Sequence, residues 1–352
     1  MFQPSDFYDL VSGRRRGIAA TGMRMGLRAA ESLYTVGVQF RNRRYDNHRA
    51  ETTKVAAPVV SVGNLTLGGT GKTPMVKWIA RHLRARDLRV AILSRGYGAA
   101  EGAKNDEALE LEQSLPDVPH LQSPDRVSIA QAAIEELESQ VLVLDDGFQH
   151  RRLVRDLDIV LLDATQPFGF DHVFPRGTLR EPARNLRRAG VVCLSRANLA
   201  TTEEREAIRQ RAQKLAPDAV WCEVAHTPAT LLNSSGIQQP LESLRGAKVF
   251  AFCGIGNPQA FRRTLEAAGA DLVGWRELAD HHDYTADDVQ ALATAAQDSG
   301  AEMAVCTQKD MVKLRVPVLK KVPLWSVVVE IEFLTGEDAM VAALAKLPIA
   351  SD

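Results

Sequence analysis

The sequence has 352 residues, 45% of them hydrophobic, and a formal net charge of −1 at pH 7. This length allows two domains with real cores, and the near-neutral charge argues against a nucleic-acid-binding protein. No run approaches the ~18 consecutive apolar residues of a membrane-spanning helix, and we see no secretory signal. The four cysteines lie far apart without a C-x-x-C pair, which favours a reducing cytosol over a disulfide framework or a zinc site.

The N-terminal stretch differs from the rest of the chain. Nine arginines stand against four acidic residues in the first fifty positions, and apolar residues recur at helical spacing between Met23 and Val38. Such a basic amphipathic helix can lie in the headgroup layer of an anionic membrane, or it can pack on its own domain. We treat residues 1–45 as a segment of their own.

The stretch "SVGNLTLGGTGKTP" (61–74) resembles a phosphate-binding loop. It departs from G-x-x-x-x-G-K-[ST] only at its first glycine, where Thr66 stands, while its downstream end is intact. A β-branched run (58–62) precedes it and a helical pattern (74–85) follows, which is the order such a loop requires. We therefore expect the nucleotide to contact Thr66, Gly68, Gly69, Thr70, Gly71, Lys72 and Thr73.

Further apolar runs alternate with helical stretches near 126–139 and 202–215, which predicts a parallel sheet covered on both faces. These runs are 89–98, 141–150, 158–164, 191–196 and 220–225. A polar stretch (227–246) indicates a boundary. A second α/β set follows, with strands at 248–255, 271–275, 302–307 and 324–333 and helices near 258–268 and 286–299.

Acidic and histidine residues follow several of these elements. Asp145 ends the apolar run "VLVLD" and is placed to hold Mg²⁺ at the carboxyl edge of the sheet. Gln149 and His150 follow closely, and we expect them to contact the nucleotide or the water shell of the metal. "NDEAL" (105–109) reads as a loop whose acids either lie near an attacking hydroxyl or are simply solvated. In "DHHDYT" (280–285), a histidine could orient a carboxylate, or both could lie on the surface.

Together these motifs resemble the tetraacyldisaccharide 4′-kinases, which phosphorylate the lipid A disaccharide precursor on the cytoplasmic face of the inner membrane. The resemblance covers nearly the whole chain. In chain order it comprises "GNLTLGGTGKTP", "SRGYG", "NDEA", "LDDGFQHRRLVRDLDI", "PRGTLREP", "GIGNP", "DHHDYT" and "TQKDMVKL". The displaced glycine is the family's own form of the loop. Asn105 replaces the glycine usual before the aspartate, and Gln308 replaces the usual glutamate.

The resemblance implies ATP and Mg²⁺ as cofactors and assigns roles to individual residues. Catalysis falls to Lys72 and Asp106, partnered by His281, with His282 as the alternative. Substrate contacts fall to Arg95, Tyr97 and Arg126, and Gln149 lines the cleft. The implied metal ligands are Thr73, Asp145, Asp146 and Glu181, with the acid that binds Mg²⁺ directly left open.

The implied fold is a P-loop core with a mostly parallel sheet, joined by a two-stranded linker to a smaller α/β domain that closes over the nucleotide. We divide the chain into the segment 1–45, a core (46–226), a linker (227–246) and the smaller domain (247–352), whose last strand and helix can return to the core. The expected protein is a monomer on an anionic membrane surface. We expect it to convert the lipid A precursor to lipid IVA and to bind no nucleic acid.

Two other functions compete with this hypothesis. A GTPase switch would need an N/T-K-x-D element, and in "TQKD" (307–310) the lysine comes one place too late. A soluble small-molecule kinase or a partner-activating ATPase is the second alternative, because a P-loop fixes the use of a nucleotide and not the acceptor. The basic N-terminal segment argues against a purely soluble enzyme.

Overall fold

A computed structural model describes residues 4–96, 106–280 and 282–349 of the chain. These residues fall into two compact units, each assembled from separate parts of the sequence. Unit 1 comprises Met1–Arg95, Val118–His226 and Ile331–Asp352, and unit 2 comprises Gly96–Asp117 and Thr227–Glu330. The chain therefore passes between the units four times.

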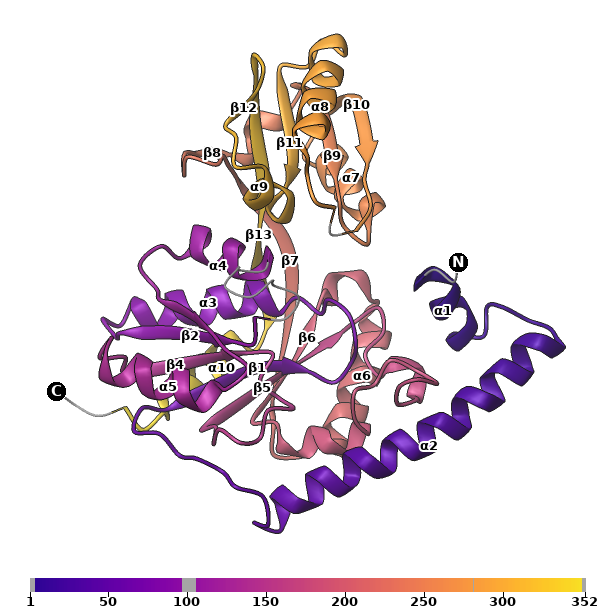
Figure 1. Cartoon of the computed structure of the whole chain (residues 1–352), viewed down its shortest axis with the longest axis vertical. Coiled ribbons are helices and arrows are strands. Elements are labelled where there is room, and N and C mark those ends of the chain that lie inside the picture. Colours follow the sequence, from indigo (N-terminus) through magenta and orange to yellow (C-terminus); the bar gives the residue numbers. More distant parts are fainter. Residues whose placement is uncertain (1–3, 97–105, 281, 350–352) are drawn as a thin grey trace. The chain divides into compact units, whose positions relative to one another are not determined.

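Unit 1 is built on a parallel sheet with the strand order β7-β6-β5-β1-β4-β2-β3 (Figure 1). Every residue of β1, β2, β4 and β6 is buried, as expected for parallel strands covered on both faces. The strands are β1 (Val59–Asn64), β2 (Val90–Ser94), β3 (His120–Gln122), β4 (Val141–Asp145), β5 (Leu157–Asp163), β6 (Val191–Ser195) and β7 (Val220–Leu232).

Helices pack on this sheet through apolar faces. Helix α3 contacts β1, β2 and β4, and α5 contacts β2 and β3. Helix α6 packs beside the short helix η2, and its N-terminus carries a capping box on Thr201. The bounds are α3 (Lys72–Arg84), α5 (Arg126–Glu135), α6 (Thr202–Leu215), η1 (Gly169–Asp171), η2 (Ala183–Arg188) and η3 (Ala197–Leu199).

Helix α2 (Ile18–Asp46) is a 29-residue helix outside the layered core of unit 1 (Figure 1). Only Ala20, Val38 and Asn42 are buried along it, so most of its surface is exposed. Helix α1 (Pro4–Val11) precedes it. Across the described ranges, no helix combines the length and the apolar character needed to cross a membrane.

Two neighbouring strands bring the chemically important loops of unit 1 to one edge of the sheet. Strands β1 and β4 are parallel and paired, with Val62 opposite Asp145. The phosphate loop follows β1 and leads into α3, whose N-cap is Gly71. Because parallel strands end at the same edge, the loop and the acidic end of β4 lie side by side.

Unit 2 has a smaller parallel sheet with the order β10-β9-β11-β13. Its strands are β8 (Gln238–Pro240), β9 (Lys248–Cys253), β10 (Asp271–Glu277), β11 (Met303–Thr307), β12 (Val318–Leu319) and β13 (Val322–Thr335). Its helices are α4 (Asp106–Ser114), η4 (Leu241–Leu244), α7 (Pro258–Ala267), α8 (Ala286–Asp298) and α9 (Gln308–Leu314). Helix α10 (Glu337–Ala345) follows β13 and belongs to unit 1.

The predicted α/β class with a mostly parallel sheet is confirmed. The interpretation of "NDEAL" as a loop was wrong, because Asp106 begins helix α4. Residues 96–117 group with unit 2 rather than with the core. The stretch expected as a linker (227–246) carries the end of β7, then β8 and η4, and groups with unit 2.

Candidate active site

The phosphate loop is held in place by the ends of two neighbouring strands. The Ser195 hydroxyl donates to the Thr70 carbonyl at 2.7 Å, and Arg196 Nη2 donates to the Gly69 carbonyl at 2.9 Å. Arg196 in turn forms an ion pair with Asp163. Ser195 ends β6, Arg196 follows it and Asp163 ends β5, so two neighbouring strand ends fix two carbonyls of the loop.

Gly71 sits where a side chain would be strained and would press on His226. Its φ is +80°, and a Cβ there would lie 2.0 Å from His226 Cε1. Burial, followed by the charge of Arg196, lowers the pKa of His226 to about 4, so its imidazole is neutral. His226 Nε2 and Thr70 Oγ1 are buried and make no hydrogen bond within the described residues. Both polar atoms therefore lie at the loop without a hydrogen-bond partner among residues 4–96, 106–280 and 282–349.

Lys72 and Asp146 form an ion pair across the two loops. Lys72 Nζ lies 3.5 Å from Asp146 Oδ1, and Arg180 Nη1 donates to both Asp146 oxygens at 2.8 Å. Burial alone would raise the pKa of Asp146, but the charges and hydrogen bonds of Lys72 and Arg180 outweigh it and lower the pKa. Asp146 is therefore an ionised carboxylate that fixes the P-loop lysine.

The donor set fits Mg²⁺ in the manner of nucleotide-dependent enzymes. Mg²⁺ is usually held by one or two carboxylates together with substrate phosphates, not by a dedicated cage of side chains. Thr73 stands in the first turn of α3, and Asp145 ends the neighbouring strand. The described residues contain no group of three or more His, Cys, Asp or Glu side chains that could bind a metal unaided.

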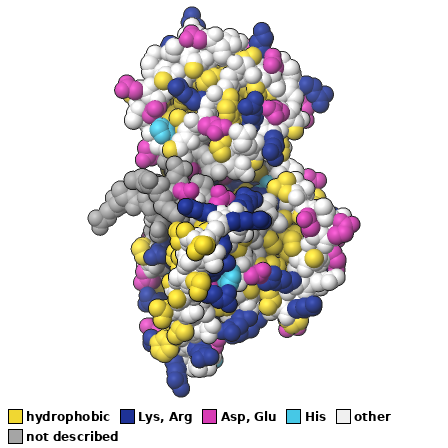
Figure 2. All heavy atoms as spheres, turned by 90° about the vertical axis from the view of Figure 1, so that its right-hand side faces the viewer, with side chains coloured by type: hydrophobic (Ala, Val, Ile, Leu, Met, Phe, Trp, Pro, Cys, Tyr) yellow, Lys and Arg dark blue, Asp and Glu magenta, His cyan; other side chains and the backbone are white. Residues whose placement is uncertain are grey.

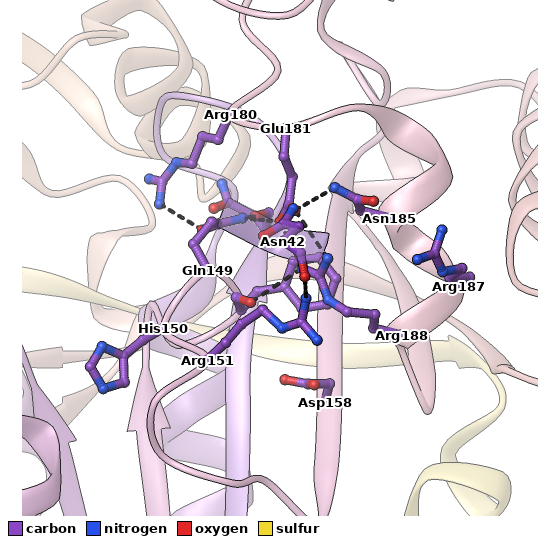
Figure 3. Close-up of polar contacts among 12 residues, drawn as sticks. Asn42, Gln149, His150, Arg151, Asp158, Arg180, Glu181, Asn185, Arg187 and Arg188 are labelled. Carbon is purple, nitrogen blue, oxygen red and sulfur yellow. Dashed lines mark hydrogen bonds and ion pairs between the residues drawn. The ribbon is translucent and has the colours of Figure 1, made fainter. Parts of the chain in front are cut away.

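Glu181, expected as a metal ligand, is engaged by protein donors instead. Its side chain is fully buried, and its two oxygens accept five hydrogen bonds. A carboxylate offers about four lone-pair sites, so the metal assignment does not fit this geometry. Figure 3 shows the donor side chains converging on it; we call Glu181, Asn42, Gln149, Asn185 and Arg188 the Glu181 cluster.

The glutamate of this cluster is charged. Burial alone would raise the pKa of Glu181, but Arg188, through its hydrogen bonds and its charge, outweighs this effect and lowers the pKa. Gln149 and Asn185 act in the same direction. Arg188 binds the carboxylate in a bidentate manner at 2.8 and 3.1 Å, the geometry in which arginine recognises carboxylates best.

Other expected nucleotide contacts have protein partners in this structure. Gln149 Nε2 donates to the Asn64 carbonyl at 2.9 Å as well as to Glu181. Thr66 is buried, its carbonyl accepts from Asn64 Nδ2 at 2.9 Å, and its backbone bridges to Leu179. Gln149 and Thr66 thus also support the base of the loop.

His150 and Arg126, expected to contact nucleotide and substrate, lie together. His150 Nδ1 is 3.5 Å from Arg126 Nη1, and burial, then the charge of Arg126, lowers the pKa of His150 to about 4. Burial, followed by the charge of Arg95, lowers the pKa of Arg126. Tyr97 lies outside the described residues.

In unit 2, Asp106 is paired with a lysine. Lys313 Nζ lies 2.8 Å from Asp106 Oδ2 and donates to the His282 carbonyl at 3.1 Å. Lys313 thus ties the "NDEA" aspartate to the "DHHDYT" segment. The His282 ring instead contacts Asp288, at 3.2 Å, which is part of the capping box of α8. His281 lies outside the described residues.

A buried aspartate joins three further motifs of unit 2. Asp310 Oδ1 accepts from the Gly254 N–H at 3.0 Å and from the Tyr284 hydroxyl at 2.7 Å. Asp310 Oδ2 accepts from the Thr307 hydroxyl at the start of α9. "GIGNP", "DHHDYT" and "TQKDMVKL" therefore meet at one side chain.

Sequence reasoning assigned no role to Arg180, Lys313 or His226. The first two stand inside motifs that carry the family resemblance, "PRGTLREP" and "TQKDMVKL". Their partners are distant in the sequence, so spacing alone could not reveal the pairs. Nothing in the sequence around His226 indicates its contact with Gly71.

A phosphate loop beside an acidic strand end, in a parallel α/β sheet, defines a P-loop nucleotide-binding protein. A family profile described as "Tetraacyldisaccharide-1-P 4'-kinase" matches residues 23–348. A tetraacyldisaccharide 4′-kinase from Anaeromyxobacter dehalogenans (strain 2CP-C) is 43% identical over 336 residues, which is 90% of this chain and 88% of the relative. One from Geobacter sulfurreducens is 37% identical, covering 91% and 93%.

A solved structure agrees with these matches. LpxK from Aquifex aeolicus, described as an "apo" form in complex with ATP, superposes with a TM-score of 0.74 at 29% identity, covering 92% of this chain and 99% of the other. The chain belongs to the tetraacyldisaccharide 4′-kinase family. Its activity is phosphorylation of the tetraacyl disaccharide 1-phosphate in lipid A biosynthesis.

Proposed function

We propose that the phosphates of ATP bind the loop from Gly68 to Thr73 and that Lys72 neutralises the transferring phosphoryl group. Support comes from the two fixed loop carbonyls, the unpartnered Thr70 hydroxyl and the placement of Lys72 beside Asp146. ATP is the nucleotide in the related Aquifex structure. Asp146 would then orient the lysine rather than accept a proton.

We assign Mg²⁺ to Thr73 and Asp145. Asp145 ends β4 beside the strand that leads into the phosphate loop, and Thr73 stands in the first turn of α3, while Glu181 is saturated by protein donors. When bound, the metal supplies charge stabilisation to the phosphates. We propose that Arg95, Tyr97 and Arg126 contact the acceptor, since the two arginines carry the positive charge that suits its phosphate.

We further propose that Asp106 accepts the proton of the 4′-hydroxyl as this oxygen attacks the γ-phosphate. Positioning matters more than basicity in such transfers, because the transition state is loose. Lys313 fixes the direction of this carboxylate at 2.8 Å. His281 is the proposed second member of the pair.

The acceptor carries acyl chains, and α2 offers a surface suited to a membrane. Five of its apolar side chains are at least 65% exposed: Ile18 (95%), Met25 (70%), Leu33 (78%), Val36 (66%) and Phe40 (65%). Figure 2 faces the side on which α2 lies and shows apolar side chains beside basic ones. We propose that the enzyme is a monomer that binds the cytoplasmic face of the inner membrane peripherally through this helix.

The observation that carries this assignment is the pairing of β1 with β4, which sets Lys72 against Asp146. The test is transfer of labelled phosphate from ATP to tetraacyl disaccharide 1-phosphate, with the position of the new phosphate determined. Lys72→Ala and Thr73→Ala should each lower kcat by about 10² or more. Normal turnover and ordinary Mg²⁺ dependence in both variants would place the nucleotide elsewhere.

A further inference from the structure

The Glu181 cluster joins two parts of unit 1 with different proposed tasks. Asn42 Nδ2, from helix α2, donates to Glu181 Oε2 at 2.9 Å across 139 residues of sequence. Gln149 Nε2, three residues beyond Asp146, donates to Glu181 Oε1 at 3.0 Å. One buried carboxylate therefore binds both the outer helix and the loop that carries the acids.

The residue before Glu181 repeats this double attachment. The Arg180 carbonyl accepts from the Tyr34 hydroxyl of α2 at 3.2 Å, while its side chain binds Asp146. The Arg180 N–H also donates to the Leu65 carbonyl at 2.7 Å, at the start of the phosphate loop. Two consecutive residues thus contact α2 on one side and the nucleotide-binding loops on the other.

The remaining members of the cluster hold Glu181 itself. Asn185 donates to Oε2 at 2.6 Å, and Arg188 supplies the compensating charge. Both stand on η2, the short helix that follows Glu181. Because Asn42, Asn185 and Arg188 stand on helices, Glu181 has little freedom to move toward a metal or a substrate.

We propose that Glu181 is a positioning residue for phosphoryl transfer: it fastens α2 to the loop that bears Asp146 and Gln149, and it does not ligate the metal. The inference rests on the proposed function for the role of that loop. Since α2 is also the proposed membrane element, displacement of α2 would reach Asp146 through Asn42, Glu181 and Gln149.

The test compares variants at both ends of this connection. Glu181→Gln should lower kcat about 10- to 100-fold, as is usual for residues that orient a catalytic group. The Mg²⁺ concentration for half-maximal rate should stay within about twofold, because no ligand of the metal is lost. A metal ligand behaves in the opposite way: the Mg²⁺ requirement rises at least about tenfold.

Rescue distinguishes the two roles further. Glu181→Gln leaves the Arg188 charge buried without its partner, which destabilises a protein more than removing both charges does. The double variant Glu181→Gln/Arg188→Gln should therefore recover about tenfold of the lost kcat. A metal-ligand role gives no recovery, and that result would overturn the proposal.

Asn42→Ala keeps the Glu181–Arg188 pair and covers the case in which Glu181→Gln does not fold. This variant should lower kcat about threefold to tenfold with an unchanged Mg²⁺ requirement, since the charged carboxylate loses one hydrogen bond from a neutral amide. Asn47→Ala is the matched control, because Asn47 carries the same amide on an exposed position just beyond α2. Equal effects of Asn42→Ala and Asn47→Ala would refute the connection.

Hydrogen exchange tests the same connection without substrate. The amides of residues 145–150 should exchange at least about threefold faster in Asn42→Ala than in Asn47→Ala or wild type, because their anchor is loosened. This readout separates the inference from the proposed function. If the wild type were inactive as a kinase but Asn42→Ala exchanged faster, only the proposed function would be overturned. If the wild type were an active kinase but exchange in Asn42→Ala were unchanged, only the positioning role of Glu181 would be overturned.

Discussion

Replacing Gly71 by alanine tests how the phosphate loop is shaped. The backbone there has φ +80°, which costs an L-residue about 1–2 kcal/mol. The new Cβ would lie 2.0 Å from His226 Cε1 and 2.3 Å from His226 Nε2, so the imidazole must move. Overpacking of this kind typically costs about 1–3 kcal/mol, and we expect a total loss of about 2–5 kcal/mol in the free energy of unfolding.

The assay is urea unfolding without nucleotide, compared with Gly69→Ala. Gly69 has no positive φ, and a Cβ there meets nothing within 4 Å, so this control should change stability by less than about 1 kcal/mol. In a double-mutant cycle, His226→Ala should recover the overpacking part of the Gly71→Ala loss and leave the backbone part. Strict additivity of the two substitutions, or an equal loss in Gly69→Ala, would refute the reasoning.

Three further predictions concern catalysis, pH and the membrane. In steady-state assays, Asp106→Asn should lower kcat about 10²- to 10⁴-fold, and Lys313→Met should lower it about 10- to 100-fold. The affinity for ATP should change little in both variants. A threefold effect or less for Asp106→Asn would contradict its role as the proton acceptor. The pKa of His150 is about 4 in the folded protein, below its unfolded value of 6.5. Between pH 6.5 and 4 the unfolded state therefore binds more protons than the folded state, and the free energy of unfolding should fall as the pH drops through this range. Urea unfolding of His150→Gln should then show about 1–3 kcal/mol less loss than wild type between pH 7 and 4.5, and parallel curves would contradict the shift. Leu33→Ser/Phe40→Ser should weaken flotation with anionic vesicles about tenfold or more, whereas Ile237→Ser, 58% exposed in unit 2, should not; equal flotation of the two would argue against α2.

The parts of the fold that could be read from the sequence have local signals. The strands of unit 1 are short apolar runs, and the loop between β1 and α3 ends in the Gly-Lys-Thr sequence that is typical of a phosphate-binding loop. Capping threonines mark the starts of α6 and α8. Because these features depend on neighbours in the chain, their positions agree closely with the structure.

Helix α4 shows where such reasoning fails. Its sequence, DEALELEQS, is mostly polar, and it packs on α9, some two hundred residues later in the chain. The Lys313–Asp106 pair depends on that packing. Glu181 is a similar case, since its five hydrogen bonds come from three separate segments. Contacts of this range leave no periodicity for a single sequence to show.

The order of the segments in unit 1 has a consequence for biosynthesis. Unit 1 receives Ile331–Asp352 only after all of unit 2 has been translated. Phe333 from this segment packs on Trp78 of α3 at 4.8 Å between ring centroids. The helix that follows the phosphate loop therefore lacks this contact until the last segment has been synthesised. Unit 2 receives its last residues before unit 1 does, and α2 leaves the ribosome before either. In a nascent chain, α2 would thus be exposed while the kinase core is still incomplete.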